Sequence, residues 1–195
     1  MRLRATMKAI SDRSRASEPL PQSSKRNIAL TGFMAVGKSV VGKKLAQRLH
    51  RRFMDLDQAI EEKERMTVSE IFNRKGESYF RTVEKQVLSE VLRKNGQVIA
   101  TGGGAILDKD NLDLLRERAL LICLTAPPAT LLRRSSSGKE RPLLKGDDRE
   151  RRVEELLRQR EKNYAQAHFS IDTGSLSVDE IVEKIIKILG PEVQG

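Results

Sequence analysis

The feature that most constrains the fold is the segment 32–39, which reads Gly-Phe-Met-Ala-Val-Gly-Lys-Ser. It matches the phosphate-binding pattern G-x-x-x-x-G-K-[ST]. An apolar run at Asn27–Thr31 precedes it as an expected strand, and the helix expected after it has Val41, Leu45 and Leu49 on one face. A strand, a glycine loop and a helix in this order predict a parallel α/β sheet whose loop binds phosphate.

The loop can bind a nucleotide through its backbone, because Gly32 and Gly37 carry no side chain that would obstruct the N–H groups. Lys38 supplies a positive charge for the β- and γ-phosphates, and the Ser39 hydroxyl is a ligand for Mg²⁺. A chance match or a plain strand-to-helix turn is the alternative, which the flanking elements disfavour. We expect ATP contacts from the loop and the first helical turn, at Gly32, Ala35, Val36, Gly37, Lys38, Ser39 and Val40.

Short apolar runs alternate with helical patterns along the rest of the chain, which is typical of βαβ units. Capping patterns at 67–70 and 177–180 predict two helix starts, and Gly76 is expected to end the first of these helices. The polar stretch Ser135–Asp148 is expected to be a lid. Further strands are expected at Arg52–Asp55, Val98–Thr101, Leu120–Thr125 and Phe169–Asp172. Further helices are expected at Glu77–Asn95, near Leu112–Arg118, from about Ala129, and over a charged segment with Val153, Leu156, Leu157 and Tyr164 inward.

The charge distribution divides the chain into an extension and a catalytic domain. Residues 1–26 contain seven Lys or Arg and two acidic residues, so this segment carries half of the formal net charge of +10. We expect 1–26 to be a disordered extension, with a plastid or other organelle targeting segment as the alternative. Residues 27–190 are expected to form one catalytic domain, and 191–195 a short tail.

The amino-acid composition indicates the cellular location of the protein and disfavours two classes of partner. Aromatic residues make up 4% of the chain, which leaves few platforms for stacking bases, so we expect no nucleic-acid partner. No apolar stretch approaches the roughly 18 residues that a membrane span needs, so we expect no membrane association. The single cysteine, Cys123, lies in an apolar run and is expected to be a buried thiol. We expect a monomer in the cytoplasm, where disulfides are rare.

A phosphate-binding loop alone does not distinguish a kinase from a GTPase or a motor ATPase. The chain has no Asn-Lys-x-Asp motif, which disfavours a GTPase. The strand at Val98–Thr101 ends in Gly102–Gly104 rather than in the carboxylate that usually supports magnesium in a motor ATPase. The carboxylate is therefore expected from the end of the second strand, at Asp55 or Asp57.

Asp55 and Asp57 are the candidates for metal binding and proton transfer. Side chains two apart in an extended segment point the same way, so both are expected to project from the carboxyl end of their strand. One can hold magnesium through water, and the other can accept a hydrogen bond from the attacking hydroxyl and take its proton. The alternative is that Asp57 only caps a helix beginning at Gln58.

Several residues that could bind the substrate that accepts the phosphate have an ordinary structural interpretation when each is taken alone. Arg81 and Glu84 are neighbours on one helix, where a solvated ion pair is the simplest interpretation. The glycines at 102–104 form either a tight turn or a place where a ligand approaches the backbone. Arg141 lies in the expected lid, where closure could bring it onto the transferring phosphate. Arg160 would ordinarily be a surface charge.

In combination and in order, these motifs resemble the shikimate kinase family over nearly all of 27–190. The matching segments are GFMAVGKS, FMDLD (53–57), FRTVE (80–84), ATGGGA (100–105), RPLL (141–144) and REKNY (160–164). The resemblance implies a three-layer P-loop kinase fold with a five-stranded parallel sheet. It also implies ATP-dependent phosphorylation of the 3-hydroxyl of shikimate, a step towards chorismate and the aromatic amino acids.

The resemblance also implies roles for individual residues. Asp55 and Ser39 would support magnesium, and Asp57 would hold the reacting hydroxyl. Arg134 would lie against adenine. Lys38, Asp57 and Arg141 would be the catalytic residues. The shikimate site would be formed by Asp57, Arg81, Gly102, Gly103, Gly104 and Arg160, with both arginines on the carboxylate.

Two departures from the family pattern matter. Ala35 stands where the family usually has glycine, so we expect the loop backbone there to avoid a positive φ angle. Lys162 and Asn163 replace the proline and leucine of the usual R-x-P-L-Y motif, which weakens the argument for Arg160. Two alternatives remain. One is the same fold acting on gluconate or another sugar acid. The other is a P-loop protein without catalysis that binds nucleic acid through its basic extension.

Overall fold

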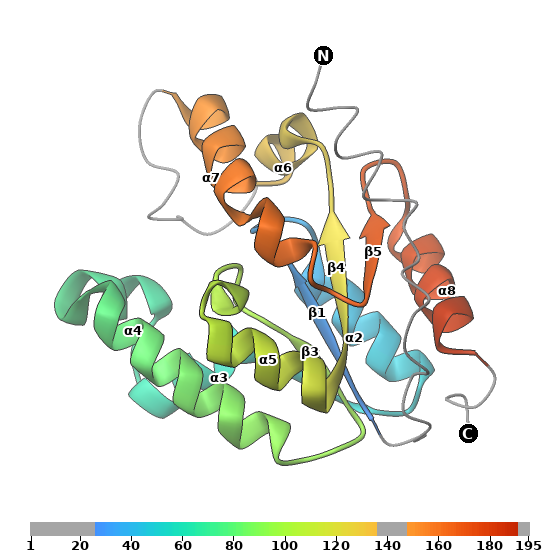
Figure 1. Ribbon diagram of the computed structural model, residues 1–195, viewed down its shortest axis with the longest axis horizontal. Helices are drawn as coiled ribbons and strands as arrows, with labels where there is room; N and C mark the ends of the chain where they lie inside the picture. Colours follow the sequence, from blue (N-terminus) through green and yellow to red (C-terminus); the bar gives the residue numbers. More distant parts are fainter. Residues whose placement is uncertain (1–25, 136–147, 191–195) are drawn as a thin grey trace.

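The computed structural model describes residues 26–135 and 148–190, and it contains one parallel β-sheet (Figure 1). The strand order is β2-β3-β1-β4-β5, which confirms the predicted five-stranded parallel sheet. The strands are β1 (Asn27–Gly32), β2 (Arg52–Asp55), β3 (Gln97–Ala100), β4 (Ala119–Thr125) and β5 (Phe169–Asp172).

Helices cover both faces of the sheet, which gives the three-layer arrangement seen in Figure 1. The helices of the described residues are α2 (Lys38–Arg48), α3 (Leu56–Glu64), α4 (Val68–Leu92), α5 (Lys109–Arg118), α6 (Pro128–Ser135), α7 (Arg149–Tyr164) and α8 (Val178–Leu189). A short 3₁₀ turn, η1 (Ala105–Leu107), follows the glycine segment after β3. The predicted helices are therefore confirmed, with small shifts at their ends.

The central strand β1 shows why the sheet is buried on both sides. All six of its residues are buried. Ile28 and Leu30 belong to the core beneath α2 and α8, whereas Ala29 belongs to the core beneath α3, α4 and α5. Because side chains alternate along a strand, an apolar run of this kind requires a helical layer on each face.

Local sequence signals set the helix boundaries. Both predicted capping boxes are present, with Thr67 bonded to the N–H of Glu70 and Ser177 bonded to the N–H of Glu180. Gly76 has φ 83° and ψ 168°, so it interrupts the helical geometry within α4, as the sequence predicted. The part of α4 that follows Gly76 carries the F-R-x-x-E motif at 80–84.

The carboxyl ends of the parallel strands meet at one edge of the sheet. β3 and β4 lie on opposite sides of β1, so the order in which strands are added to the sheet changes direction at β1. Open α/β sheets bind ligands at such a switch point. The phosphate-binding loop after β1, the end of β2 and the glycine segment after β3 all lie there.

Three predicted features lie wholly or mostly outside the described residues. The expected lid, with Arg141, lies outside the described residues except at its two ends, and so does the expected C-terminal tail. The basic extension is also outside them except for Arg26, whose guanidinium donates to the carbonyl of Arg116 at 2.7 Å.

Cys123 is buried, as predicted, and burial raises the pKa of its thiol to about 12. Within 26–135 and 148–190, none of the helices combines the length and the apolar character that crossing a membrane requires.

Candidate active site

The loop after β1 has a backbone that glycine makes possible at two positions. Gly32 has φ 135°, and a Cβ atom there would lie 2.2 Å from the carbonyl oxygen of Leu124. Gly37, the N-cap of α2, has φ 103° in the left-handed region. Both conformations are disfavoured for residues with a side chain. The loop therefore depends on these two glycines for its shape as well as for access to its N–H groups.

Ala35 contradicts the expectation that its backbone would avoid a positive φ angle. Its φ is 61°, in the left-handed region, which costs an alanine roughly 1–2 kcal/mol. Two buried neighbours explain how the loop keeps this conformation: Phe33 and Val36 are both in the core and anchor the chain on either side of Ala35. The Val36 N–H closes the turn on the Phe33 carbonyl at 3.4 Å. Core packing therefore outweighs the local strain.

Lys38 lies over this loop rather than in solvent. Its ammonium donates to the carbonyl oxygens of Gly32 at 2.9 Å and Phe33 at 3.0 Å. The positive charge is thus held against the backbone of the loop, and the N-terminal end of α2 adds its partial positive charge nearby. Val40, in the first turn of α2, has an exposed side chain, so any contribution to nucleotide binding would come from its backbone.

Ser39 and Asp55 form the junction between α2 and the end of β2. The Ser39 hydroxyl donates to Asp55 Oδ2 at 2.6 Å. Asp55 Oδ1 accepts from the N–H groups of Asp57 and Gln58, which makes Asp55 the N-cap of α3. A hydroxyl and a carboxylate oxygen are the hard oxygen ligands that Mg²⁺ prefers, and magnesium beside nucleotide phosphates usually needs few protein ligands. The donor set therefore fits magnesium.

The same geometry corrects two expectations about Asp57. The helix begins at Leu56, not Gln58, and its cap is Asp55. Asp57 lies in the first helical turn, so the two aspartates do not share an extended segment. The alternation of side chains along a strand does not apply across a helix start. Asp57 nevertheless reaches the acceptor side, because its Oδ1 lies 3.0 Å from the position that a Cβ atom of Gly102 would occupy.

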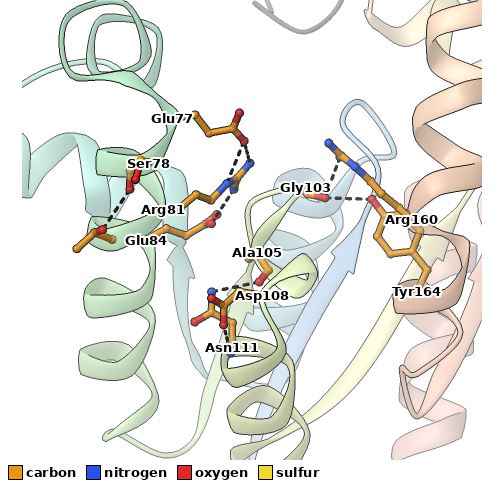
Figure 2. Close-up of polar contacts among 11 residues, drawn as sticks. Glu77, Ser78, Arg81, Glu84, Gly103, Ala105, Asp108, Asn111, Arg160 and Tyr164 are labelled. Atoms are coloured by element: carbon orange, nitrogen blue, oxygen red, sulfur yellow. Dashed lines mark hydrogen bonds and ion pairs between the residues drawn. The ribbon is translucent and has the colours of Figure 1, made fainter.

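The triple glycine brings the predicted acceptor residues together. A Cβ atom at Gly102 would lie 2.7 Å from Glu84 Oε1, and one at Gly104 would lie 2.8 Å from Arg81 Nη2. Arg160 approaches the middle glycine from the opposite side, on α7. Figure 2 shows the Gly103 backbone between the Arg81 and Glu84 pair of α4 and the Arg160 side chain of α7. Side chains at 102 and 104 would displace these charged groups from their present positions, so the glycines leave room for them as well as access to the backbone.

Arg81 and Glu84 are a partly buried ion pair, which corrects the interpretation as a solvated one. Arg81 Nη1 donates to Glu84 Oε2 at 2.7 Å, and Nη2 contacts Glu77 Oε1 at 3.0 Å (Figure 2). Glu84 is 1% exposed, and its Oε1 has no hydrogen-bond partner among the described residues. Burial raises the pKa of Glu84, and the positive charge of Arg81 only partly offsets that effect. Burial alone would lower the pKa of Arg81, but the charges and hydrogen bonds of Glu84 and Glu77 together outweigh burial and raise it.

Arg160 is also buried, so its ordinary interpretation as a surface charge is wrong. It is 5% exposed, and its Nη1 donates to the Gly103 carbonyl at 3.1 Å. Its guanidinium carbon lies 5.5 Å from the centre of the Phe33 ring, within the range of a cation–π contact. Arg160 thus connects the phosphate-binding loop with the glycine segment. The replacement of proline and leucine by Lys162 and Asn163 does not displace it.

Arg134 lies beside the phosphate-binding loop, where its Nη1 contacts the Val36 carbonyl at 3.5 Å. Its Nη2 donates to the Thr173 carbonyl at 2.8 Å and its Nη1 to Thr173 Oγ1 at 3.1 Å. The Thr173 hydroxyl also bonds to the Thr125 carbonyl at 3.0 Å, so α6, β4 and the segment after β5 are held together. Arg141, expected on the phosphates, lies outside the described residues.

Sequence reasoning missed Thr173. This residue is fully buried and follows the carboxyl end of β5, at the ligand-binding edge of the sheet. Its position directly after a predicted strand was the one signal that could have identified it. Glu84 was recognised as the neighbour of Arg81, but its burial beside Gly102 could not be read from helical spacing.

Comparisons with known proteins agree with this geometry. The family model for shikimate kinase matches residues 34–190. A shikimate kinase from Thermoanaerobacter pseudethanolicus is 44% identical over 162 residues, which cover 83% of this chain and 95% of that protein. The solved structure of shikimate kinase from Acinetobacter baumannii in complex with shikimate has a TM-score of 0.81 and 37% identity, covering 85% of this chain and 93% of that one. Shikimate kinase from Aquifex aeolicus has a TM-score of 0.74 and 34% identity, covering 87% and 99%. The chain therefore belongs to the shikimate kinase family.

Proposed function

We propose that this chain transfers the γ-phosphate of ATP to the 3-hydroxyl of shikimate, giving shikimate 3-phosphate and ADP. Family membership supports ATP as the donor and shikimate as the acceptor. The observation that carries the proposal is the placement of Gly102–Gly104 between Arg81 and Arg160, with Asp57 beside Gly102. This arrangement suits a small hydroxylated acid better than a nucleotide base or a protein segment.

The two arginines would fix the acceptor through its carboxylate. They come from α4 and α7, on opposite sides of the glycine segment (Figure 2). Two guanidinium groups on different elements can orient a carboxylate as well as bind it, since each offers hydrogen bonds in a fixed plane. The glycines allow the ring of the acid to lie against the backbone. Orientation is a large part of what an enzyme supplies to phosphoryl transfer.

Asp57 would align the nucleophile. Its carboxylate accepts a hydrogen bond from the 3-hydroxyl and takes the proton as the new oxygen–phosphorus bond forms. The bond between the γ-phosphorus and the oxygen that bridges to the β-phosphate breaks, and its electron pair leaves with ADP. Lys38 would stabilise the charge on the transferring phosphoryl group, and Arg141 would do so from the expected lid.

The nucleotide would be held by the loop at 32–40 and by Arg134. The backbone N–H groups from Gly32 to Val40 and the N-terminal end of α2 would face the phosphates, and Arg134 would lie against adenine. Ser39 and Asp55 would hold magnesium, directly or through water. When bound, this ion neutralises part of the phosphate charge.

Location, assembly and the role of the extension belong to the proposal as well. We expect a monomer in the cytoplasm, with no nucleic-acid partner. Deleting residues 1–26 tests the alternative that the basic extension binds nucleic acid. Turnover that survives the deletion fits an enzyme, whereas a salt-sensitive affinity for nucleic acid that disappears with the extension would support the alternative.

The direct test of the reaction is release of ADP from ATP by the purified chain, measured with shikimate and, separately, with gluconate. We expect shikimate to stimulate ADP release and gluconate to leave it at the background rate. Nuclear magnetic resonance of the product identifies the phosphorylated hydroxyl. Stimulation by gluconate but not by shikimate would keep the fold and overturn the acceptor.

A further inference from the structure

The carbonyl of Gly103 accepts two hydrogen bonds from the last turns of α7. Arg160 Nη1 donates at 3.1 Å, and the Tyr164 hydroxyl donates at 3.0 Å (Figure 2). The two residues are four apart on one helix, so their side chains lie on the same face. A carbonyl oxygen has two lone pairs, and both are used here. Helix α7 therefore fixes the orientation of the Gly103 carbonyl.

This orientation determines what the glycine segment presents to the other side. The described residues contain no cis peptide bond, so the Gly103 C=O and the following N–H of Gly104 point in opposite directions. With the carbonyl turned towards α7, the N–H of Gly104 is turned away from α7. A change in the bonds from α7 would rotate this peptide and alter the surface offered to an acceptor.

Of the two donors, Tyr164 is the more rigid. Its ring is buried in the core beneath α4 and α5, and burial raises the pKa of its hydroxyl to about 12. At neutral pH it is therefore a protonated hydroxyl held by a packed ring. Arg160 has a longer and more flexible side chain, and it is also the proposed ligand of the substrate carboxylate. If Arg160 reorients towards that carboxylate, the Tyr164 bond continues to hold Gly103.

Asn163 adds a second attachment three residues further along the same loop. Its Nδ2 donates to the carbonyl of Ile106 at 3.0 Å, in η1. The end of α7 thus holds the segment at both Gly103 and Ile106. Asn163 is one of the two residues that depart from the usual family motif, and here it makes a bond that leucine cannot make.

We infer that Tyr164 is a positioning residue for the acceptor site: its hydroxyl holds the Gly103 carbonyl and thereby sets the backbone that shikimate contacts. The inference rests on the proposed function, because the consequence is expected in shikimate binding. Tyr164 does not touch the reacting atoms. Its role is to keep Gly103, Gly104 and Arg160 in the geometry that accepts the acid.

The test compares Tyr164→Phe with Tyr79→Phe in the ADP-release assay. Phenylalanine keeps the buried ring and removes only the hydroxyl. Tyr79 is the matched control, because it is the other tyrosine of the chain and its hydroxyl bonds Glu64 and Lys75 away from the glycine segment. We expect Tyr164→Phe to raise the KM for shikimate about tenfold, the size expected for losing one buried hydrogen bond. The KM for ATP should change by less than about twofold in both variants.

The outcomes separate this inference from the proposed function. Wild-type protein that releases no ADP with shikimate would contradict the proposed function, and the inference would fall with it. Active wild-type protein with an unchanged shikimate KM in Tyr164→Phe would overturn the inference alone. Equal rises in the KM values for ATP and shikimate would also overturn it, since they would indicate a general loss of structure rather than a change in the acceptor site.

A second measurement does not require the Tyr164 variant to fold. In Tyr79→Phe the remaining tyrosine is Tyr164, so isotope-labelled tyrosine gives a single resonance from its ring carbon at the hydroxyl. We expect saturating shikimate to shift this resonance, because Arg160 and Tyr164 share one acceptor. A resonance that does not respond to shikimate, in protein that binds it, would overturn the inference.

Discussion

Ser39 and Asp55 are joined by a 2.6 Å hydrogen bond, which ties the start of α2 to the end of β2. The same aspartate caps α3 with its other oxygen. One side chain therefore positions the helix that carries Asp57 and faces the hydroxyl proposed to hold magnesium. This single carboxylate therefore connects the proposed nucleotide side with the helix that carries Asp57.

Replacing Asp55 with asparagine separates its two roles. Asparagine caps helices about as well as aspartate, so the free energy of unfolding should change by less than about 1 kcal/mol. The lost charge should raise the Mg²⁺ concentration needed for half-maximal activity by about 10-fold to 100-fold. Activity measured against Mg²⁺ concentration, together with urea unfolding, checks both expectations. An unchanged Mg²⁺ dependence would remove Asp55 from the metal site.

Lys38→Met should nearly abolish turnover. The ammonium lies over the phosphate-binding loop on the carbonyls of Gly32 and Phe33, and methionine keeps the length of the chain without the charge. Loss of one group that stabilises charge in the transition state typically lowers the rate by about 10²–10³. Lys43→Met, at an exposed position on the same helix, is the matched control and should keep normal turnover. Near-normal activity of Lys38→Met, with intact circular dichroism, would reject the role.

Asp57→Asn should lower kcat by about 10²-fold or more, within the usual range for general acid–base groups, while ATP binding changes little. The reason is geometric, because Asp57 lies beside Gly102 and the acceptor residues rather than at the capping position. Isothermal titration with an ATP analogue measures the binding, and the ADP-release assay measures kcat. Collapse of ATP binding would instead make Asp57 a structural or metal residue.

Because Glu84 is buried, we expect it to make the free energy of unfolding depend on pH. Burial raises its pKa above the ordinary value of 4.5, so its contribution to stability is fully present below pH 4.5 and is lost as the pH rises through the folded-state value. The free energy of unfolding of the wild type minus that of Glu84→Gln should therefore fall with rising pH. Glutamine has no proton to lose, so the variant removes this titration and leaves the other groups.

Urea unfolding of both proteins at intervals from about pH 4 to about pH 8 measures this difference. Comparing the two proteins cancels the contributions of other carboxylates whose pKa values are lowered, such as Glu64 and Glu90. A difference that grew with pH would mean that the Arg81 ion pair outweighs burial and holds the pKa of Glu84 below its ordinary value.

Much of the fold could be predicted from sequence, because its signals are local. The apolar runs predicted β2 and β5 at their observed bounds, and the capping boxes at Thr67 and Ser177 predicted two helix starts. Gly76 interrupts α4 because its backbone lies outside the helical region. Glycine adopts such a backbone more readily than other residues, so the interruption could be predicted from the sequence. These features depend on neighbours within a few residues.

The errors concern tertiary packing. Ala35 keeps a left-handed backbone because Phe33 and Val36 are anchored in the core, which a rule for single residues cannot include. Helix α3 begins at Leu56, so Asp57 lies in a helix rather than in the strand, and it reaches Gly102 from there. The burial of Arg160 follows from the contact between α7 and the glycine segment, which lie 57 residues apart in sequence. Helical spacing alone favoured a surface position.

The most direct test of the central claim is a crystal structure of the chain with a non-hydrolysable ATP analogue and shikimate bound together. We expect phosphates within the loop at 32–39, the shikimate carboxylate on Arg81 and Arg160, and the 3-hydroxyl within hydrogen-bond distance of Asp57. A shikimate ring bound far from Asp57, or a complex in which ATP binds and shikimate has no site beside Gly102–Gly104, would contradict it.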